Sequence, residues 1–147
     1  RRSGGKPGDV LLVTGRLGGA LRSGRHLRFD PRLEQGRWLT GAVPVHAMMD
    51  LSDGLARDLP RLARASGVGF ELDAGAVPRH RGCSLAQALG EGEDYELLLA
   101  VAARSAGKLE ALWRRRFPRL ALTRIGRLVA DVGEGSDLEG GWDHFAE

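Results

Sequence analysis

Two short acidic runs hold the residues of this chain whose types and spacing are best suited to chemistry. The first run, residues 49–55, contains Asp50 and Asp53, and the second, residues 92–97, contains Glu93. Carboxylates gathered without neighbouring bases are costly unless water, backbone donors or a cation neutralise them. Magnesium is usually held by one or two carboxylates together with phosphate oxygens of a bound substrate. The two runs therefore indicate a site for a metal ion and a phosphate.

The first run lies just before an apolar pattern with helical spacing. If a helix starts at Ser52 or Asp53, the carboxylates of Asp50 and Asp53 converge in front of its N-terminus, where backbone N–H groups favour phosphate. In the alternative interpretation, Asp50 or Ser52 only caps the helix and Asp53 only complements its dipole. Spacing alone favours this alternative, because acidic helix starts are common.

In the second run, Gly92 permits an unusual backbone angle or a close approach by a ligand just before Glu93. The alternative is a loop whose acids face water. The presence of two such runs in one small domain keeps the functional interpretation open beside the structural one.

Other motifs indicate less chemistry. The glycine-rich residues 15–19 lack the GK[ST] ending and the GxGxxG spacing of phosphate loops, so we expect a turn. The four histidines and Cys83 do not show the spacing of a zinc site. Trp142 lies near the end of a glycine-rich stretch, where it could plug the core or stack on a ligand ring.

The elements that must position these residues follow from the apolar pattern. We predict a fold of the α/β (α+β) class, with a mixed sheet and a split βαβ arrangement. Pro60 predicts a kink or a late start in the first predicted helix, and residues 15–40 are expected to be irregular. The predicted strands are residues 10–14, 68–72, 95–101 and 120–129, and the predicted helices are residues 51–66, 84–89 and 105–117.

Composition excludes several classes of protein. The 147 residues, 42% hydrophobic and 28% charged, are typical of one soluble globular domain without a membrane span or a signal core. The single cysteine fits a reducing cytoplasm. The net charge of +3 comes mostly from scattered arginines, since Lys6 and Lys108 are the only lysines among the 22 basic residues. We therefore expect neither nucleic-acid binding nor a membrane partner.

Several short motifs in the right order resemble the thiamine-monophosphate kinase family. They are residues 46–55, 65–69 and 92–97, the opening residues 2–9, the ending residues 141–145, and residues 25–28 followed by 31–33. The sequence departs from the family at Glu91, where the family usually has a second glycine, and at Pro60, which interrupts a segment that is normally helical.

This resemblance implies an activity and an architecture. The family transfers the γ-phosphoryl group of ATP to thiamine monophosphate, giving thiamine diphosphate, with magnesium ions. It shares its two-domain fold with aminoimidazole ribonucleotide synthetase. Residues 1–147 would then be the single C-terminal domain, without the N-terminal ATP-binding domain that forms the homodimer in the full-length protein. We expect such a fragment to be inactive alone.

The resemblance also implies roles for six residues. Asp50 and Asp53 match magnesium ligands, Arg2 and Ser52 match ATP contacts, and Glu93 and Trp142 match substrate-binding positions. No covalent nucleophile is needed, because phosphoryl transfer depends mostly on positioning and on neutralising charge. Two other hypotheses stay open: a related ATP-dependent enzyme with another substrate, and a stand-alone domain that binds a nucleotide or a protein.

Overall fold

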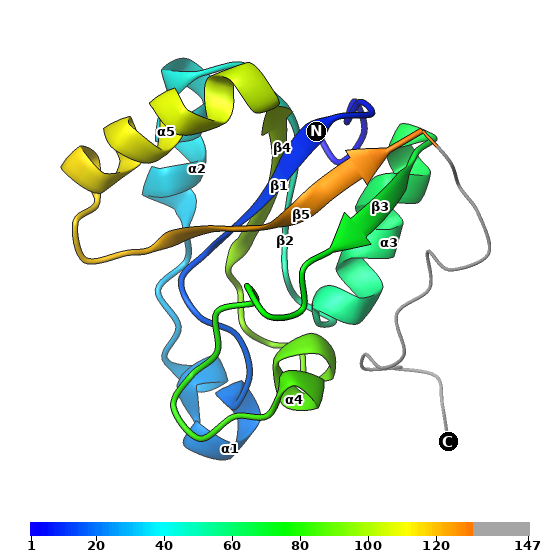
Figure 1. Ribbon diagram of the computed structural model, residues 1–147. Helices are drawn as coiled ribbons and strands as arrows, with labels where there is room; N and C mark the ends of the chain where they lie inside the picture. The colour runs from blue at the N-terminus through cyan, green and yellow to red at the C-terminus, as the bar shows by residue number, and fades with distance from the viewer. Residues whose placement is uncertain (131–147) are drawn as a thin grey trace.

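One five-stranded sheet forms the centre of the computed structural model, which describes residues 1–130. Its strand order is β2-β4-β1-β5-β3, and each neighbouring pair is antiparallel. The strands, coloured by position along the chain in Figure 1, are β1 (Asp9–Thr14), β2 (Val45–Asp50), β3 (Gly69–Leu72), β4 (Leu97–Ala102) and β5 (Leu122–Val129).

The pairing confirms the α+β class and the split βαβ arrangement. Because β4 and β5 both run antiparallel to β1, which lies between them, they point the same way and are joined through α5 (Ala103–Arg116). The expected mixed sheet is wrong, since strands with the same direction are never neighbours. Within residues 1–130, the single parallel pairing is an isolated bridge between Leu17 and Arg79.

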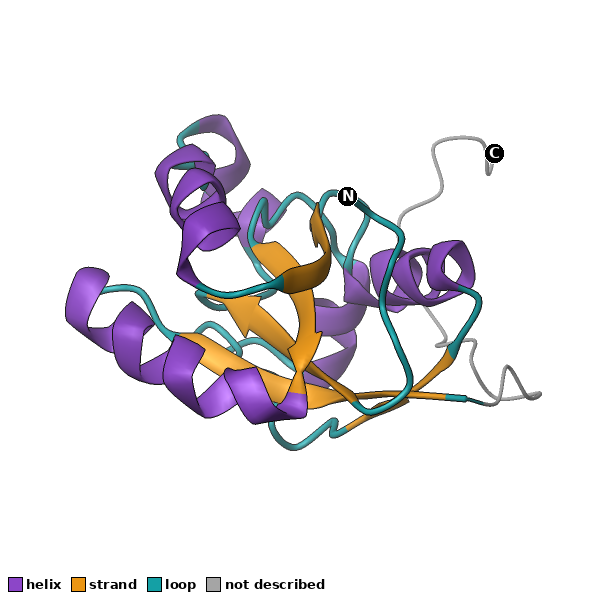
Figure 2. Cartoon of the chain, turned by 90° about the horizontal axis from the view of Figure 1, so that it is seen from above, coloured by secondary structure: helices purple, strands orange, loops and turns teal. Residues whose placement is uncertain are grey.

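Helices cover both faces of the sheet (Figures 1 and 2). α2 and α5 pack on one face, whereas α3 and α4 contribute to the core on the other. Besides α5, the helices are α1 (Ala20–Ser23), a 3-10 turn (Arg25–Leu27), α2 (Leu33–Ala42), α3 (Leu55–Ser66) and α4 (Leu85–Gly90).

The strand β1 explains why the apolar runs are continuous. Leu11 faces the core beside α3, whereas Leu12 faces the core beside α2 and α5. Leu98 and Leu99 divide in the same way on β4. Strands buried on both faces need apolar residues at every position, so simple alternation disappears.

The helix α2 was missed, because residues 15–40 were expected to be irregular. Its only buried residues are Gln35 and Leu39, and Arg32 at its N-cap makes no side-chain capping bond. A short helix with so few apolar positions leaves little periodic pattern in the sequence.

The start of α3 also differs from the prediction. The helix begins at Leu55 after Gly54, so Ser52 is not its cap and Asp53 is not in its first turn. Pro60 lies inside the helix, which makes the predicted late start wrong. The helix ends as expected at Gly67, whose left-handed conformation (φ 68°) suits glycine.

Candidate functional site

Backbone hydrogen bonds join the two acidic runs. The Leu51 N–H donates to the Glu96 carbonyl at 2.8 Å, and the Tyr95 N–H donates to the Leu51 carbonyl at 2.9 Å. The Glu93 N–H donates to the Ser52 carbonyl at 2.7 Å. The residues that these bonds join are 41 to 45 positions apart in sequence, yet the two runs form one unit in space, as a shared site requires.

Glycines allow this close approach. A Cβ on Gly54 would lie 2.7 Å from the Leu89 carbonyl oxygen, and one on Gly92 would lie 2.8 Å from the Ser52 carbonyl oxygen. Both glycines have a positive φ, and so do the non-glycine residues Glu93 (58°) and Tyr95 (51°). Such conformations cost energy and gather at functional sites in proteins.

The charges of three carboxylates act on the Tyr95 phenol. The hydroxyl donates to Glu93 at 2.9 Å, and this bond, followed by burial and the negative charges of Glu93, Asp50 and Asp53, raises the pKa of Tyr95. Asp50 is the exposed last residue of β2, and Asp53 lies in the loop before α3, where Arg61 pairs with it. The chain therefore brings together three of its predicted site residues.

Asp58 is a fourth carboxylate that sequence reasoning missed. It is fully buried in the first turn of α3 and accepts the N–H groups of Ser52 and Asp53, each at 3.0 Å. Burial raises its pKa, although these bonds and Arg61 favour the charged form. The available indication was an acid between Leu55 and Leu59, inside an apolar helical pattern. Asp58 fixes the loop that carries Asp53, one of the two predicted metal ligands.

The donor set around Asp50 and Asp53 fits magnesium better than zinc. Among the residues that the structure describes, no group of three His, Cys, Asp or Glu side chains is arranged to hold a metal ion. Magnesium does not need such a cage, since one or two carboxylates and substrate phosphates suffice. A cation at Asp53 would share or replace the charge that Arg61 now supplies.

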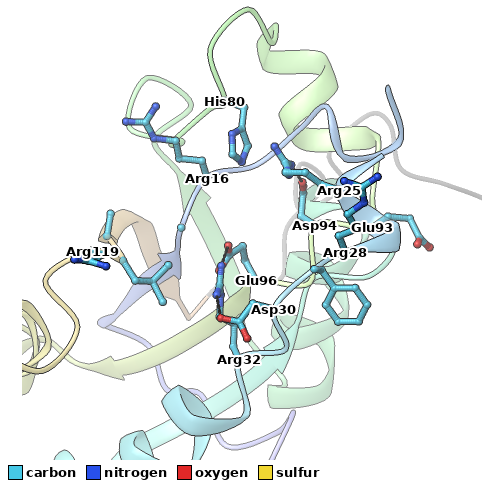
Figure 3. A pocket seen from close by; sticks show the side chains of 14 residues that line it. Arg16, Arg25, Arg28, Asp30, Arg32, His80, Glu93, Asp94, Glu96 and Arg119 are labelled. Carbon is cyan, nitrogen blue, oxygen red and sulfur yellow. Dashed lines mark hydrogen bonds and ion pairs between the residues drawn. The ribbon is translucent and has the colours of Figure 1, made fainter. Parts of the chain in front are cut away.

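A hollow of about 390 Å³ borders the second acidic run (Figure 3). Its lining includes Glu93 and the buried side chains of Asp94 and Glu96. Two bonds tie Glu96 to Arg32, at 2.9 and 2.7 Å. Sequence reasoning assigned no role to Arg32 or Glu96, because the partners of this pair are 64 residues apart.

Asp94 accepts the Gly18 N–H with both carboxylate oxygens, at 3.0 Å each, and Arg25 approaches it at 3.3 Å. Burial nevertheless raises its pKa to about 6. Beside Asp94, the rings of Phe29 and Tyr95 stack with centroids 4.1 Å apart. Phe29 lines both this hollow and a neighbouring groove that contains Asp50, so the stack stands between the two.

The remaining predicted residues are less defined. Arg2 is exposed and follows Arg1, whose carbonyl accepts the Met48 N–H at 2.8 Å, so this segment lies beside β2. Ser52 is half-buried in the loop before α3. Trp142 lies outside the described residues.

Residues 6–138 match the family described as AIR synthase related protein, C-terminal domain. This match covers most of the sequence, and the chain belongs to that family. No helix within residues 1–130 is long and apolar enough to cross a membrane.

Within this family, the chain is similar to thiamine-monophosphate kinases. The Rhodopirellula baltica protein is 38% identical over 143 residues, which cover 90% of this chain and 43% of that protein. The Escherichia coli K12 protein is 34% identical over 183 residues, covering 99% of this chain and 55% of that protein. The chain thus spans about half the length of these curated relatives, and the resemblance found in its motifs is confirmed.

Solved structures agree with this assignment. Thiamine-monophosphate kinase from Stenotrophomonas maltophilia superposes with a TM-score of 0.77 at 31% identity, covering 90% of this chain and 51% of that chain. AaThiL complexed with AMPPCP and TMP gives a TM-score of 0.75 at 29% identity, covering 98% and 53%.

Proposed function

We propose that this chain supplies the C-terminal half of the active site of an enzyme that transfers the γ-phosphoryl group of ATP to thiamine monophosphate. The product is thiamine diphosphate. The observation that carries this proposal is the set of backbone hydrogen bonds that joins the segment of Asp50 and Asp53 to the loop of Glu93. It is supported by relatives named thiamine-monophosphate kinase and by a similar protein that binds AMPPCP and TMP.

In this proposal, Asp50 and Asp53 hold Mg²⁺, which when bound neutralises charge on the phosphoryl group. Ser52 and Arg2 contact ATP. The Asp58 carboxylate accepts the N–H groups of Ser52 and Asp53 and so holds their loop in place. Phosphoryl transfer then needs little more from the chain than positioning.

Glu93 and Trp142 bind the thiamine moiety in this proposal. A carboxylate is a suitable partner for a cationic thiazolium ring, and an aromatic side chain attracts the same cation through its face. The Tyr95 hydroxyl donates to Glu93 and so fixes the direction of its carboxylate.

The rest of the active site would come from the part of the relatives that this chain does not cover. We therefore propose that the chain acts within a longer, cytoplasmic and homodimeric protein, and that it has no kinase activity by itself.

The test uses the full-length protein with Asp50→Asn and Asp53→Asn variants. Each variant should lose about 100-fold or more in kcat, equal to about 2.7 kcal/mol of transition-state stabilisation. Asp73→Asn is the matched control, because Asp73 lies in an exposed turn after β3. Assays with thiamine monophosphate and with other phosphate acceptors would distinguish this enzyme from a relative with another substrate. Full activity in the Asp50→Asn variant would refute the proposed metal site.

A further inference from the structure

The hollow beside the second acidic run is lined by an unusual number of arginines. They come from four separate segments: the loop after β1, the 3-10 turn and the residue after it, the N-cap of α2, and the turn before β5. In Figure 3, Arg16 and Arg119 lie on one side of the hollow, and Arg25 and Arg28 lie on the other. Arg32 lies against Glu96. These residues are Arg16, Arg25, Arg28, Arg32 and Arg119.

Two of the five are neutralised by buried acids. Arg25 pairs with Asp94 at 3.3 Å, and Arg32 holds Glu96 with two bonds. Burying these acids without their arginines would be costly, so both pairs serve to keep the hollow intact. They leave little charge for a ligand.

The other three guanidinium groups are available. Within residues 1–130, Arg16, Arg28 and Arg119 have no carboxylate partner, and each side chain is exposed. Figure 3 shows Arg16 extending away from the centre of the hollow, where no described contact holds it. Exposed arginine stems can turn toward a bound anion without breaking a bond.

The remaining acids of the lining, Asp30 and Glu93, offset part of this charge, so the five arginines and four acids together carry a formal charge of +1. Asp30 lies 3.3 Å from Arg32, which Glu96 already neutralises, and Glu93 accepts the Tyr95 hydroxyl. Figure 3 shows the Glu93 side chain directed away from Glu96. The pKa of His80 is lowered, first by burial and then by the positive charges of Arg25 and Arg16.

We propose that this hollow is a binding site for the phosphate group of a small organic phosphate, held by Arg16, Arg28 and Arg119. Guanidinium groups present paired donors that match phosphate oxygens. The volume of about 390 Å³ exceeds what one phosphate fills and lies within the range of small-molecule sites. Phe29 and Leu120 add apolar surface for the organic part.

The test titrates this chain with inorganic phosphate at constant ionic strength and follows the arginine side-chain N–H resonances by NMR. An Arg28→Gln/Arg119→Gln variant should bind phosphate about tenfold more weakly than the unchanged chain, or worse. The matched control is Arg104→Gln/Arg115→Gln, which removes the same charge from exposed positions on α5. It should leave the affinity unchanged.

If both variants bind phosphate equally weakly, the loss reflects only the lower net charge of the chain, and the proposal is overturned. A response that does not saturate across the millimolar range would also overturn it. NMR spectra that keep their dispersion show that each variant is folded, so a loss of binding cannot be assigned to unfolding.

A second titration identifies the source of the phosphate. If the hollow takes the phosphate of an organic ligand, thiamine monophosphate should bind more tightly than inorganic phosphate. Equal affinities would overturn the organic part of the proposal. Displacement of bound phosphate by thiamine, which carries no phosphate, as effectively as by thiamine monophosphate would overturn the phosphate site. An Asp50→Asn/Asp53→Asn variant should still bind, so failure of the proposed kinase function would leave this result untouched.

Discussion

Asp94 shows how burial can outweigh favourable partners at a single residue. Its carboxylate faces the Gly18 N–H and Arg25, both of which favour the charged form, yet desolvation raises its pKa from 3.8 to about 6. Nearby Glu96 and Glu91 add to the increase. The folded chain therefore binds a proton at Asp94 more tightly than the unfolded chain does.

This shift predicts a pH-dependent stability with a defined sign. The contribution of Asp94 to the free energy of unfolding should be greatest below about pH 4 and should decrease as the pH rises through about 6. Urea unfolding should show that, as the pH rises from about 4 to above 6, the Asp94→Asn variant becomes more stable relative to the unchanged chain. A constant difference between the two proteins at every pH would contradict the assigned pKa.

Glu91 shows how a departure from a family pattern can be accommodated. Its side chain accepts the Gly19 N–H and the Gln87 amide, and so ties the end of α4 to the loop after β1. Gly92 follows immediately and still adopts a positive φ of 70°. The loop that carries Glu93 therefore needs only one glycine at this place.

At the scale of elements, the site depends on two loops whose backbones touch. Gly92 packs against the Ser52 carbonyl and the Asp53 backbone, and Gly54 packs against the end of α4. No side chain fits between them, so the spacing of the acidic runs is set by the glycines.

Gly92→Ala should therefore lower the free energy of unfolding by about 2–4 kcal/mol, from left-handed strain and overpacking together. The control is Gly107→Ala in α5, where an added Cβ meets nothing within 4 Å. That change should stabilise the chain by about 0.5–1 kcal/mol. Chemical denaturation measures both, and similar effects of the two substitutions would refute the role given to Gly92.

Local patterns were sufficient for most of the elements. The apolar runs of β1 and β4 and the capping box of Ser84 and Gln87 at α4 can be read within a few residues. The strand directions could not be read in this way, because they depend on which strand lies between β4 and β5. Predicting the start of α3 failed for a related reason: the Asp58 side chain holds Ser52 and Asp53 outside the helix.

The candidate site divides similarly. Asp50, Asp53 and Glu93 stood out because acids beside glycine are conspicuous in sequence. The arginines of the hollow did not, since they are scattered over more than 100 positions and only the fold collects them. Sequence reasoning therefore singled out these acidic residues as candidates and assigned no role to the arginines of the hollow.

At the scale of the whole molecule, Glu96 connects three distant parts of the chain. It accepts the Thr14 hydroxyl at 2.6 Å and holds Arg32 with two bonds. Thr14 in turn accepts the Leu97 N–H at 2.8 Å. The end of β1, the start of β4 and the N-cap of α2 are thus joined through one buried carboxylate.

Arg32→Met should cost about 3 kcal/mol of stability, because it leaves the Glu96 charge buried without its partner. Adding Glu96→Gln should cost less than the sum of the single changes by about 1–3 kcal/mol. The exposed Arg124–Glu110 pair is also joined by two bonds, and a double-mutant cycle on this pair is the matched control. Its coupling energy should be less than about 1 kcal/mol. Equal coupling energies in the two cycles would show that burial does not strengthen the Arg32–Glu96 pair.

The backbone hydrogen bonds that join the two acidic runs form a seam, and this seam also has a kinetic consequence. The amides of Leu51, Glu93 and Tyr95 all bond across it, so none can exchange its hydrogen for deuterium until the seam parts. If the seam opens as one cooperative unit, the three exchange rates should converge, although the residues belong to different loops. Ligands that bridge the loops would then slow all three by the same factor.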